Sequence, residues 1–164
     1  MIRARAIATA LLTIAGTAVA EGDLQASEVA VWRASLQLET SDGPHKVHFQ
    51  TITLRSRNLA TLLRSSNDCP TTAWPDDTAA RIKAANEVIV RLDDSLWTVQ
   101  NAKRTRRARR SGDYMFLTRP VFDPSGTRAL LIVVTSTFSG DLLEATRKDG
   151  TWTVRRCNSW LDMY

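Results

Sequence analysis

The side chains that most often carry chemistry in proteins are sparse in this chain of 164 residues. Its two histidines, His45 and His48, are three positions apart at the start of a predicted strand. Successive strand side chains point to opposite faces, so this odd spacing separates the two imidazoles and makes them a poor pair of metal ligands. We therefore expect surface or rim histidines, with no metal site and no cofactor.

Nucleophilic catalysis would have to draw on residues scattered through the chain. The sequence has no G-x-S-x-G elbow, no Gly-rich phosphate loop and no H-E-x-x-H motif. Two acidic pairs flank a predicted helix, where capping and solvation explain them: Asp76-Asp77 and Asp93-Asp94. The serines that could combine with the histidines are Ser35, Ser56, Ser136 and Ser159. No catalytic residue is assigned, and a non-catalytic protein is favoured.

The first twenty residues, 1–20, have the pattern of a secretory signal peptide. Arg3 and Arg5 precede an apolar run, Ala6 to Val19, which is shorter than the ~20 residues needed to span a bilayer. Small residues end the run, so cleavage is predicted between Ala20 and Glu21. We expect a periplasmic or secreted protein with one domain over residues 21–164 and no transmembrane segment after cleavage.

The two cysteines, Cys69 and Cys157, would be the only thiols of the exported domain. There is no C-x-x-C spacing and no histidine near either cysteine, which disfavours redox and metal roles. An even pair in an oxidising compartment is more often bridged than free. The sequence therefore predicts a Cys69–Cys157 disulfide.

Positive charge is concentrated in one short segment, although the whole chain carries 22 basic and 17 acidic side chains. This segment could attract an anionic envelope component or an acidic protein, while the alternative is a solvated connector. It has no interleaved aromatic residues for base stacking, so nucleic acid is an unlikely partner. The candidate anion-binding residues are Lys103, Arg104, Arg106, Arg107, Arg109 and Arg110.

Helical spacing dominates residues 23–92, with one strand between helices. Apolar residues predict a helix from Leu24 to Leu38 and another from Asp76 or Asp77 to Leu92, with Val88 and Ile89 on its apolar side. The intervening predictions are a strand over Lys46 to Arg55, with a bulge near Thr51, and a short helix over Asn58 to Arg64.

Strand patterns dominate residues 95–161. Ser95 to Gln100 predicts a short strand, and a basic loop is expected over residues 101–113. Short Gly- and Asp-rich turns separate the later β-rich runs, which requires antiparallel hairpins. The predicted fold is α+β, with N-terminal helices packed on a C-terminal antiparallel meander of about four to six strands. The four later runs are Tyr114 to Phe122, Arg128 to Phe138, Leu142 to Lys148 and Thr151 to Trp160.

Two of these observations concern how the strands would pack. The uninterrupted apolar stretch Leu130 to Val134 favours a central strand covered on both faces. Trp32, Trp97 and Trp152 are expected in the core, whereas Trp74 and Trp160 are expected to pack around the disulfide.

The C-terminal half resembles a recurring element of uncharacterised exported bacterial proteins. The residues that carry the resemblance are Thr118 to Asp123, Gly126 with Ala129-Leu130, Gly140, Lys148 to Trp152, and Trp160. The resemblance implies tight turns and packed aromatic side chains, and it implies no activity.

Two functions remain open on this reading of the sequence. The first is a non-catalytic interaction module that contacts an anionic envelope component through Lys103 to Arg110. The second is a small exported hydrolase or small-ligand-binding protein whose site lies between the helices and the sheet. A pocket in which histidine, aspartate and serine side chains converge would favour the second.

Overall fold

A computed structural model describes residues 21–52, 63, 69, 74–106, 114–135 and 140–158 of the chain. The predicted signal peptide therefore lies outside the described residues, as does Trp160. The same holds for Ser56, Ser136 and Ser159, and for Arg107, Arg109 and Arg110 of the basic segment.

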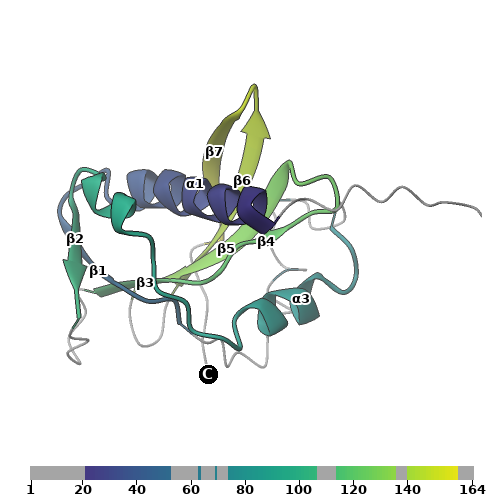
Figure 1. The fold of residues 1–164 in the computed structure, drawn as a ribbon, viewed down its shortest axis with the longest axis horizontal. Coiled ribbons are helices and arrows are strands. Elements are labelled where there is room, and N and C mark those ends of the chain that lie inside the picture. Colours follow the sequence, from purple (N-terminus) through teal and green to yellow (C-terminus); the bar gives the residue numbers. More distant parts are fainter. Residues whose placement is uncertain are drawn as a thin grey trace, which may run out of the picture.

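The fold is α+β, with a mixed seven-stranded sheet between helical segments (Figure 1). Helix α1 (Glu21–Glu39) crosses one face of the sheet, and α3 (Thr78–Ala85) lies beneath the other. The strand order is β2-β1-β3-β5-β6-β7, with β4 paired to β5. The strands are β1 (His45–His48), β2 (Ala102–Thr105), β3 (Tyr114–Leu117), β4 (Val121–Phe122), β5 (Arg128–Val134), β6 (Gly140–Lys148) and β7 (Thr151–Asn158).

Strand β5 lies in the interior of the sheet, and apolar side chains cover both of its faces. Leu131 and Val133 belong to the core cluster under α1, while Leu130 and Ile132 belong to the cluster on the opposite face. All four are at most 1% exposed. The prediction that the stretch Leu130 to Val134 forms a central strand is therefore confirmed.

Helix α1 confirms the helix predicted over Leu24 to Leu38. Trp32 and Leu36 lie one turn apart on its buried face and are 2% and 0% exposed. The Trp32 indole Nε1 donates a hydrogen bond of 2.9 Å to the carbonyl oxygen of Thr118. This buried bond anchors the helix to the chain between β3 and β4.

The C-terminal hairpins also follow the prediction. Strand β6 pairs antiparallel with both β5 and β7. The turn between β6 and β7 has two central residues with positive φ, Asp149 at 50° and Gly150 at 79°. That pair of left-handed residues suits the tight turns whose twist matches a hairpin, and Asp-Gly is a preferred sequence for them.

The predicted antiparallel meander is incomplete because β1 joins the sheet in parallel. Its register pairs Lys46 with Lys103 of β2 on one side and with Tyr114 of β3 on the other. Parallel neighbours need a long crossover, and here residues 49–101 provide it between β1 and β2. Strand β1 is shorter than predicted, although an isolated bridge between Gln50 and Arg91 follows it.

Two local predictions before β3 are wrong. The segment Ser95 to Gln100 is not a strand, because Asp94–Thr98 forms a 3₁₀ helix, η2. The Asp93 carboxylate caps that helix by accepting a hydrogen bond of 2.8 Å from the backbone N–H of Ser95. The segment predicted as a basic loop begins with strand β2, because Lys103 and Arg104 pair with β1.

Helix α3 ends well before the predicted boundary at Leu92. The Asn86 side chain donates to the carbonyl oxygen of Ile82 and also bonds both the N–H and the carbonyl oxygen of Arg119, which fixes the chain as it leaves the helix. Beyond this point Val88 and Ile89 are 64% and 53% exposed, so their predicted apolar packing is wrong. Leu63 is helical and buried, and the rest of the helix predicted around it lies outside the described residues.

Within the described part of the chain, no helix combines the length and the hydropathy needed to cross a bilayer.

Candidate functional site

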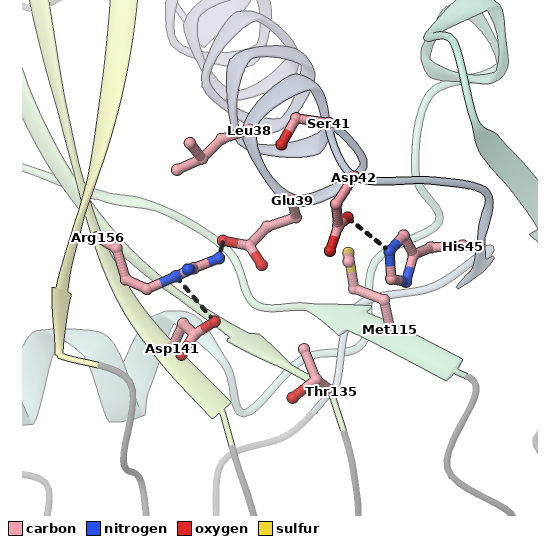
Figure 2. A pocket seen from close by; sticks show the side chains of 9 residues that line it. All are labelled: Leu38, Glu39, Ser41, Asp42, His45, Met115, Thr135, Asp141 and Arg156. Carbon is pink, nitrogen blue, oxygen red and sulfur yellow. Dashed lines mark hydrogen bonds and ion pairs between the residues drawn. The ribbon is translucent and has the colours of Figure 1, made fainter.

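A pocket of about 340 Å³ opens where the C-terminal end of α1 meets the sheet (Figure 2). The segments around it come from distant parts of the chain: the end of α1 and the turn after it, the first residue of β1, strands β3, β6 and β7, and the residue after β5. The lining residues are Leu38, Glu39, Ser41, Asp42, His45, Met115, Thr135, Asp141 and Arg156.

Arg156 joins two carboxyl groups on one wall of this pocket. Figure 2 shows its guanidinium between Glu39 of α1 and Asp141 of β6. Arg156 Nη2 is 2.9 Å from Glu39 Oε1, and Arg156 Nε is 3.1 Å from Asp141 Oδ2. The two carboxyl side chains are only 4% and 13% exposed. This triad ties the end of α1 to the β6–β7 hairpin.

The two carboxyl groups of the triad hold protons more tightly than free ones do. Burial raises the pKa of Glu39, and the hydrogen bond and the charge of Arg156 only partly oppose that effect. Burial likewise raises the pKa of Asp141 against the charge of Arg156. A single guanidinium thus serves two carboxyl groups that are poorly hydrated.

The opposite rim of the pocket has a different electrostatic character. His45 Nε2 lies 3.1 Å from Asp42 Oδ1, and the Asp42 side chain is 80% exposed. The hydrogen bond from His45 lowers the pKa of Asp42. Carboxyl groups with pKa values shifted in opposite directions therefore face one cavity.

The serine of the pocket, Ser41, is not arranged for nucleophilic attack. Ser41 is exposed on the rim, and among the described residues no hydrogen bond joins it to His45. Ser35, a serine singled out in the sequence, is fully buried and donates to the carbonyl oxygen of Val31 one turn earlier in α1. The pocket has groups for hydrogen bonding and proton exchange, and its serine lacks an activating base.

The histidines are not brought together. His45 lines the pocket, whereas His48 stacks against Phe49 and Phe116, with each ring centroid 5.0 Å from that of the imidazole. Odd spacing on β1 accounts for the separation, as expected from the sequence.

The raised pKa values predict a specific pH dependence of stability, which Glu39→Gln tests. Between the unfolded pKa and the raised folded pKa, the native state binds more protons than the unfolded state, so stability falls as pH rises through this window. The wild-type protein should therefore lose more unfolding free energy than Glu39→Gln between about pH 4 and about pH 7. Urea unfolding at both pH values measures the difference. Identical pH slopes in the two proteins would contradict the raised pKa.

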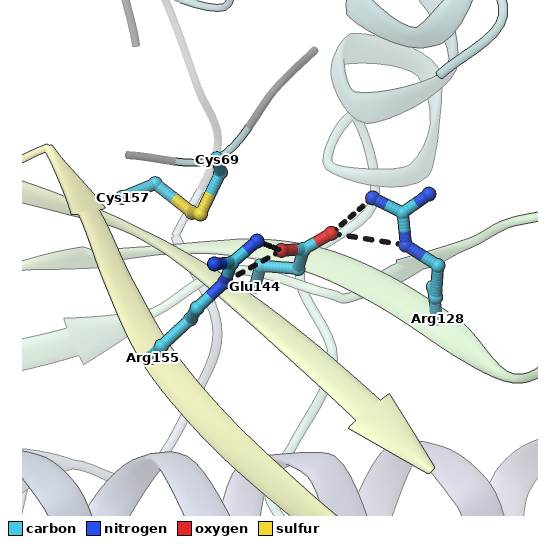
Figure 3. Close-up of a disulfide and its surroundings, with 5 residues drawn as sticks. All are labelled: Cys69, Arg128, Glu144, Arg155 and Cys157. Carbon is cyan, nitrogen blue, oxygen red and sulfur yellow. Dashed lines mark hydrogen bonds and ion pairs between the residues drawn. A yellow bond between two sulfur atoms is a disulfide. The ribbon is translucent and has the colours of Figure 1, made fainter. Parts of the chain in front are cut away.

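The predicted disulfide is present and lies on the face of the sheet opposite α1 (Figure 3). Beside it Glu144, 1% exposed, receives hydrogen bonds from Arg128 Nε at 3.0 Å and from Arg155 Nε at 2.9 Å. The two cysteine sulfurs and a Glu144 oxygen lie within 4.8 Å of one another, a spacing compatible with metal ligands. The sulfurs are bonded to each other and the carboxylate is held by two guanidinium groups, so the cluster is structural.

Trp74 packs in the same apolar cluster as both cysteines, as predicted. The Arg128 guanidinium carbon lies 4.9 Å from the centre of its ring. Its buried indole Nε1 has no hydrogen-bond partner among the described residues, and Trp74 contributes apolar and cation–π contacts to this cluster.

The described residues of the basic segment differ in their surroundings. The Arg104 guanidinium carbon lies 5.7 Å from the ring centres of both Phe49 and Trp97, and its Nη1 pairs with Asp94 at 3.3 Å. Arg104 therefore packs against the protein itself. Lys103 and Arg106 are exposed.

The buried members of the pocket were missed in the sequence. One signal was present for Glu39: it lies seven positions after Trp32 and three after Leu36, which places a carboxylate on the apolar face of α1. Asp141 and Arg156 had no such signal, because isolated charges are common on β-hairpins. Comparison of the chain with protein-family models, with curated proteins and with solved structures gave no match, so the resemblance to uncharacterised exported proteins stays a prediction.

Proposed function

We propose that this is an exported protein that binds a small polar molecule in the pocket between α1 and the sheet. The observation that carries the proposal is the convergence of Glu39 of α1 with Asp141 and Arg156 of the distant β6–β7 hairpin on a cavity of about 340 Å³. That volume is at the lower end of the range for ligand pockets. Leu38 and Met115 add apolar surface beside the polar groups, which matches the usual composition of such sites.

Binding is favoured over hydrolysis because, among the described residues, no base activates the pocket's serine, Ser41. The His45 Nε2 atom already bonds Asp42, and Ser41 has no hydrogen bond to that imidazole in the described structure. The carboxyl groups can instead accept hydrogen bonds from hydroxyl or amino groups of a ligand. Export places this binding in the periplasm or outside the cell, and the Cys69–Cys157 disulfide supports an oxidising location.

A pocket-filling variant tests the proposal. Ser41→Trp places a bulky ring at an exposed position on the rim, so it should block the cavity without disturbing the core. A ligand-observed NMR screen would use free sugars, amino sugars, amino acids and polyamines as probes. At least one class should bind saturably to the wild-type protein, and Ser41→Trp should weaken that binding at least tenfold, about 1.4 kcal/mol.

The matched control is Gln25→Trp, an equally large change at an exposed position near the other end of α1. This variant should bind the same probe with wild-type affinity. Absence of binding in every class, or equal binding by Ser41→Trp, would refute the proposal.

The interaction module suggested by the basic segment stays a second proposal, because Lys103 and Arg106 are exposed. This surface is separate from the pocket, because neither residue lines it.

A further inference from the structure

Strands β2, β1 and β3 are neighbours at one edge of the sheet (Figure 1). A row of side chains runs across them on the face opposite α1. Lys46 is the register partner of both Lys103 and Tyr114, and register partners project from the same side of a sheet. The neighbouring residue Val47 points the other way, into the core under α1. Lys46, Lys103 and Tyr114, here called the basic row, therefore share the opposite face.

The basic row holds positive charge that the described part of the protein does not neutralise. Like charges directly opposite each other on neighbouring strands are destabilising. Lys46 and Lys103 are both exposed, and Arg106 adds a third exposed cation just beyond β2. No described carboxylate forms an ion pair with any of the three, in contrast to Arg104, which pairs with Asp94. The repulsion would be relieved by an anionic partner.

Aromatic side chains border these cations. The Lys46 Nζ atom lies 5.5 Å from the centre of the Tyr114 ring. Phe116, two residues farther along β3, and His48 are half-buried on the same face, with their ring centroids 5.0 Å apart. The face therefore changes from aromatic to cationic towards the edge strand β2. Amphipathic rings and long lysine side chains with exposed ammonium groups suit the headgroup region of a bilayer.

We propose that the basic row, with Arg106, docks the protein on the anionic headgroups of a lipid bilayer. The strand edge brings the cations to the phosphates, and Tyr114 lies at the level of the headgroups. This surface is separate from the pocket: the basic row shares no residue with the pocket lining. The two proposals can therefore fail independently.

Co-sedimentation with phosphatidylcholine vesicles, with and without phosphatidylglycerol, tests this docking. The wild-type protein should bind only the anionic vesicles, and binding should weaken as salt is raised from about 0.01 M to about 0.15 M, because the Debye length shortens. The double variant K46Q/K103Q should bind about 30-fold more weakly, since each basic residue near an anionic surface contributes roughly fivefold.

The matched control is R147Q/K148Q, which removes two exposed charges near the tip of the β6–β7 hairpin. The affinity of this control for anionic vesicles should lie within about twofold of the value expected from its lower net charge alone. It should bind clearly more tightly than K46Q/K103Q. Urea unfolding checks the fold, and removing the lysine pair should leave stability unchanged or slightly raised.

Three outcomes would overturn the docking proposal. These are absence of wild-type binding to anionic vesicles, equal losses in K46Q/K103Q and R147Q/K148Q, and binding to soluble polygalacturonate without binding to vesicles. The last outcome would identify an anionic polysaccharide as the partner instead of a membrane.

Discussion

Replacing both Cys69 and Cys157 with alanine is expected to lower the free energy of unfolding by about 4 to 5 kcal/mol. The bridge joins residues separated by 88 positions, and closing so long a loop removes much of the conformational entropy of the unfolded chain. A typical domain has only about 5 to 15 kcal/mol of stability in total. The double variant should therefore be partly or largely unfolded under conditions in which the wild-type protein is folded.

The position of the bridge explains why its loss is costly. Both cysteines are 1% exposed and pack in the cluster that includes Trp74, Leu130 and Leu142. The disulfide holds the segment around Cys69 against the last strand, and it does so beside the buried carboxylate of Glu144. Reduction should loosen this whole face of the sheet before it affects the face under α1.

Urea unfolding with and without dithiothreitol measures the contribution of the disulfide. The reduced wild-type protein and the C69A/C157A variant, which has no thiol, should unfold at similar, strongly lowered urea midpoints. Adding dithiothreitol to the variant is the control and should change nothing. An unchanged midpoint for the wild-type protein after complete reduction would show that the disulfide does not stabilise the fold.

The parts of the fold that could be predicted are those specified by neighbouring residues. The turn Asp149-Gly150 leaves two strands little choice except an antiparallel hairpin, and β6 pairs with β7 accordingly. Trp32 and Leu36 recur at helical spacing and lie on the buried face of α1. Each of these predictions needed information from only one short window of sequence.

The parallel pairing of β1 could not be predicted from any short stretch of the sequence. Whether the four residues of β1 join β3 depends on a partner almost seventy positions later, as in the pair of Lys46 with Tyr114. Side-chain bonds also overrode local propensity: Asn86 bonds Arg119 where α3 leaves its helical path, and Asp93 caps η2 where a strand was expected. Tertiary partners decided these boundaries.

The candidate pocket shows the same limit more strongly. The residues of its triad, Glu39, Asp141 and Arg156, come from α1, β6 and β7, and the ion pair of Glu39 with Arg156 spans 117 positions. Disulfide prediction succeeded because a chain with two cysteines has only one possible intramolecular pairing. Charged residues offer many pairings, so sequence could not select this triad.

The second large effect is expected from Glu144→Gln, which should destabilise the protein by about 2 to 3 kcal/mol near neutral pH. Removing one partner of a buried ion pair typically costs about 3 to 5 kcal/mol. The lower value is expected here because the side chains of Arg128 and Arg155 are 24% and 54% exposed, so water can partly replace the lost carboxylate. Glu144 itself is 1% exposed and accepts hydrogen bonds from both arginines.

The loss of unfolding free energy caused by Glu144→Gln should depend on pH in a defined direction. Burial of Glu144 opposes its ionisation, but the hydrogen bonds from Arg128 and Arg155 outweigh that effect and lower its pKa below the ordinary value of 4.5. Its contribution is therefore present above that value and is lost as pH falls through the lowered folded pKa. The difference in unfolding free energy between wild type and Glu144→Gln should shrink in strong acid.

Glu87→Gln is a suitable control, because Glu87 is exposed and the same substitution there should change stability by no more than about 0.5 kcal/mol. A Glu144→Gln deficit that stayed constant from neutral pH into strong acid would mean that shape, and not charge, accounts for the loss. A deficit that disappears in acid would instead assign the stability of this face to two guanidinium groups sharing one carboxylate beside the disulfide.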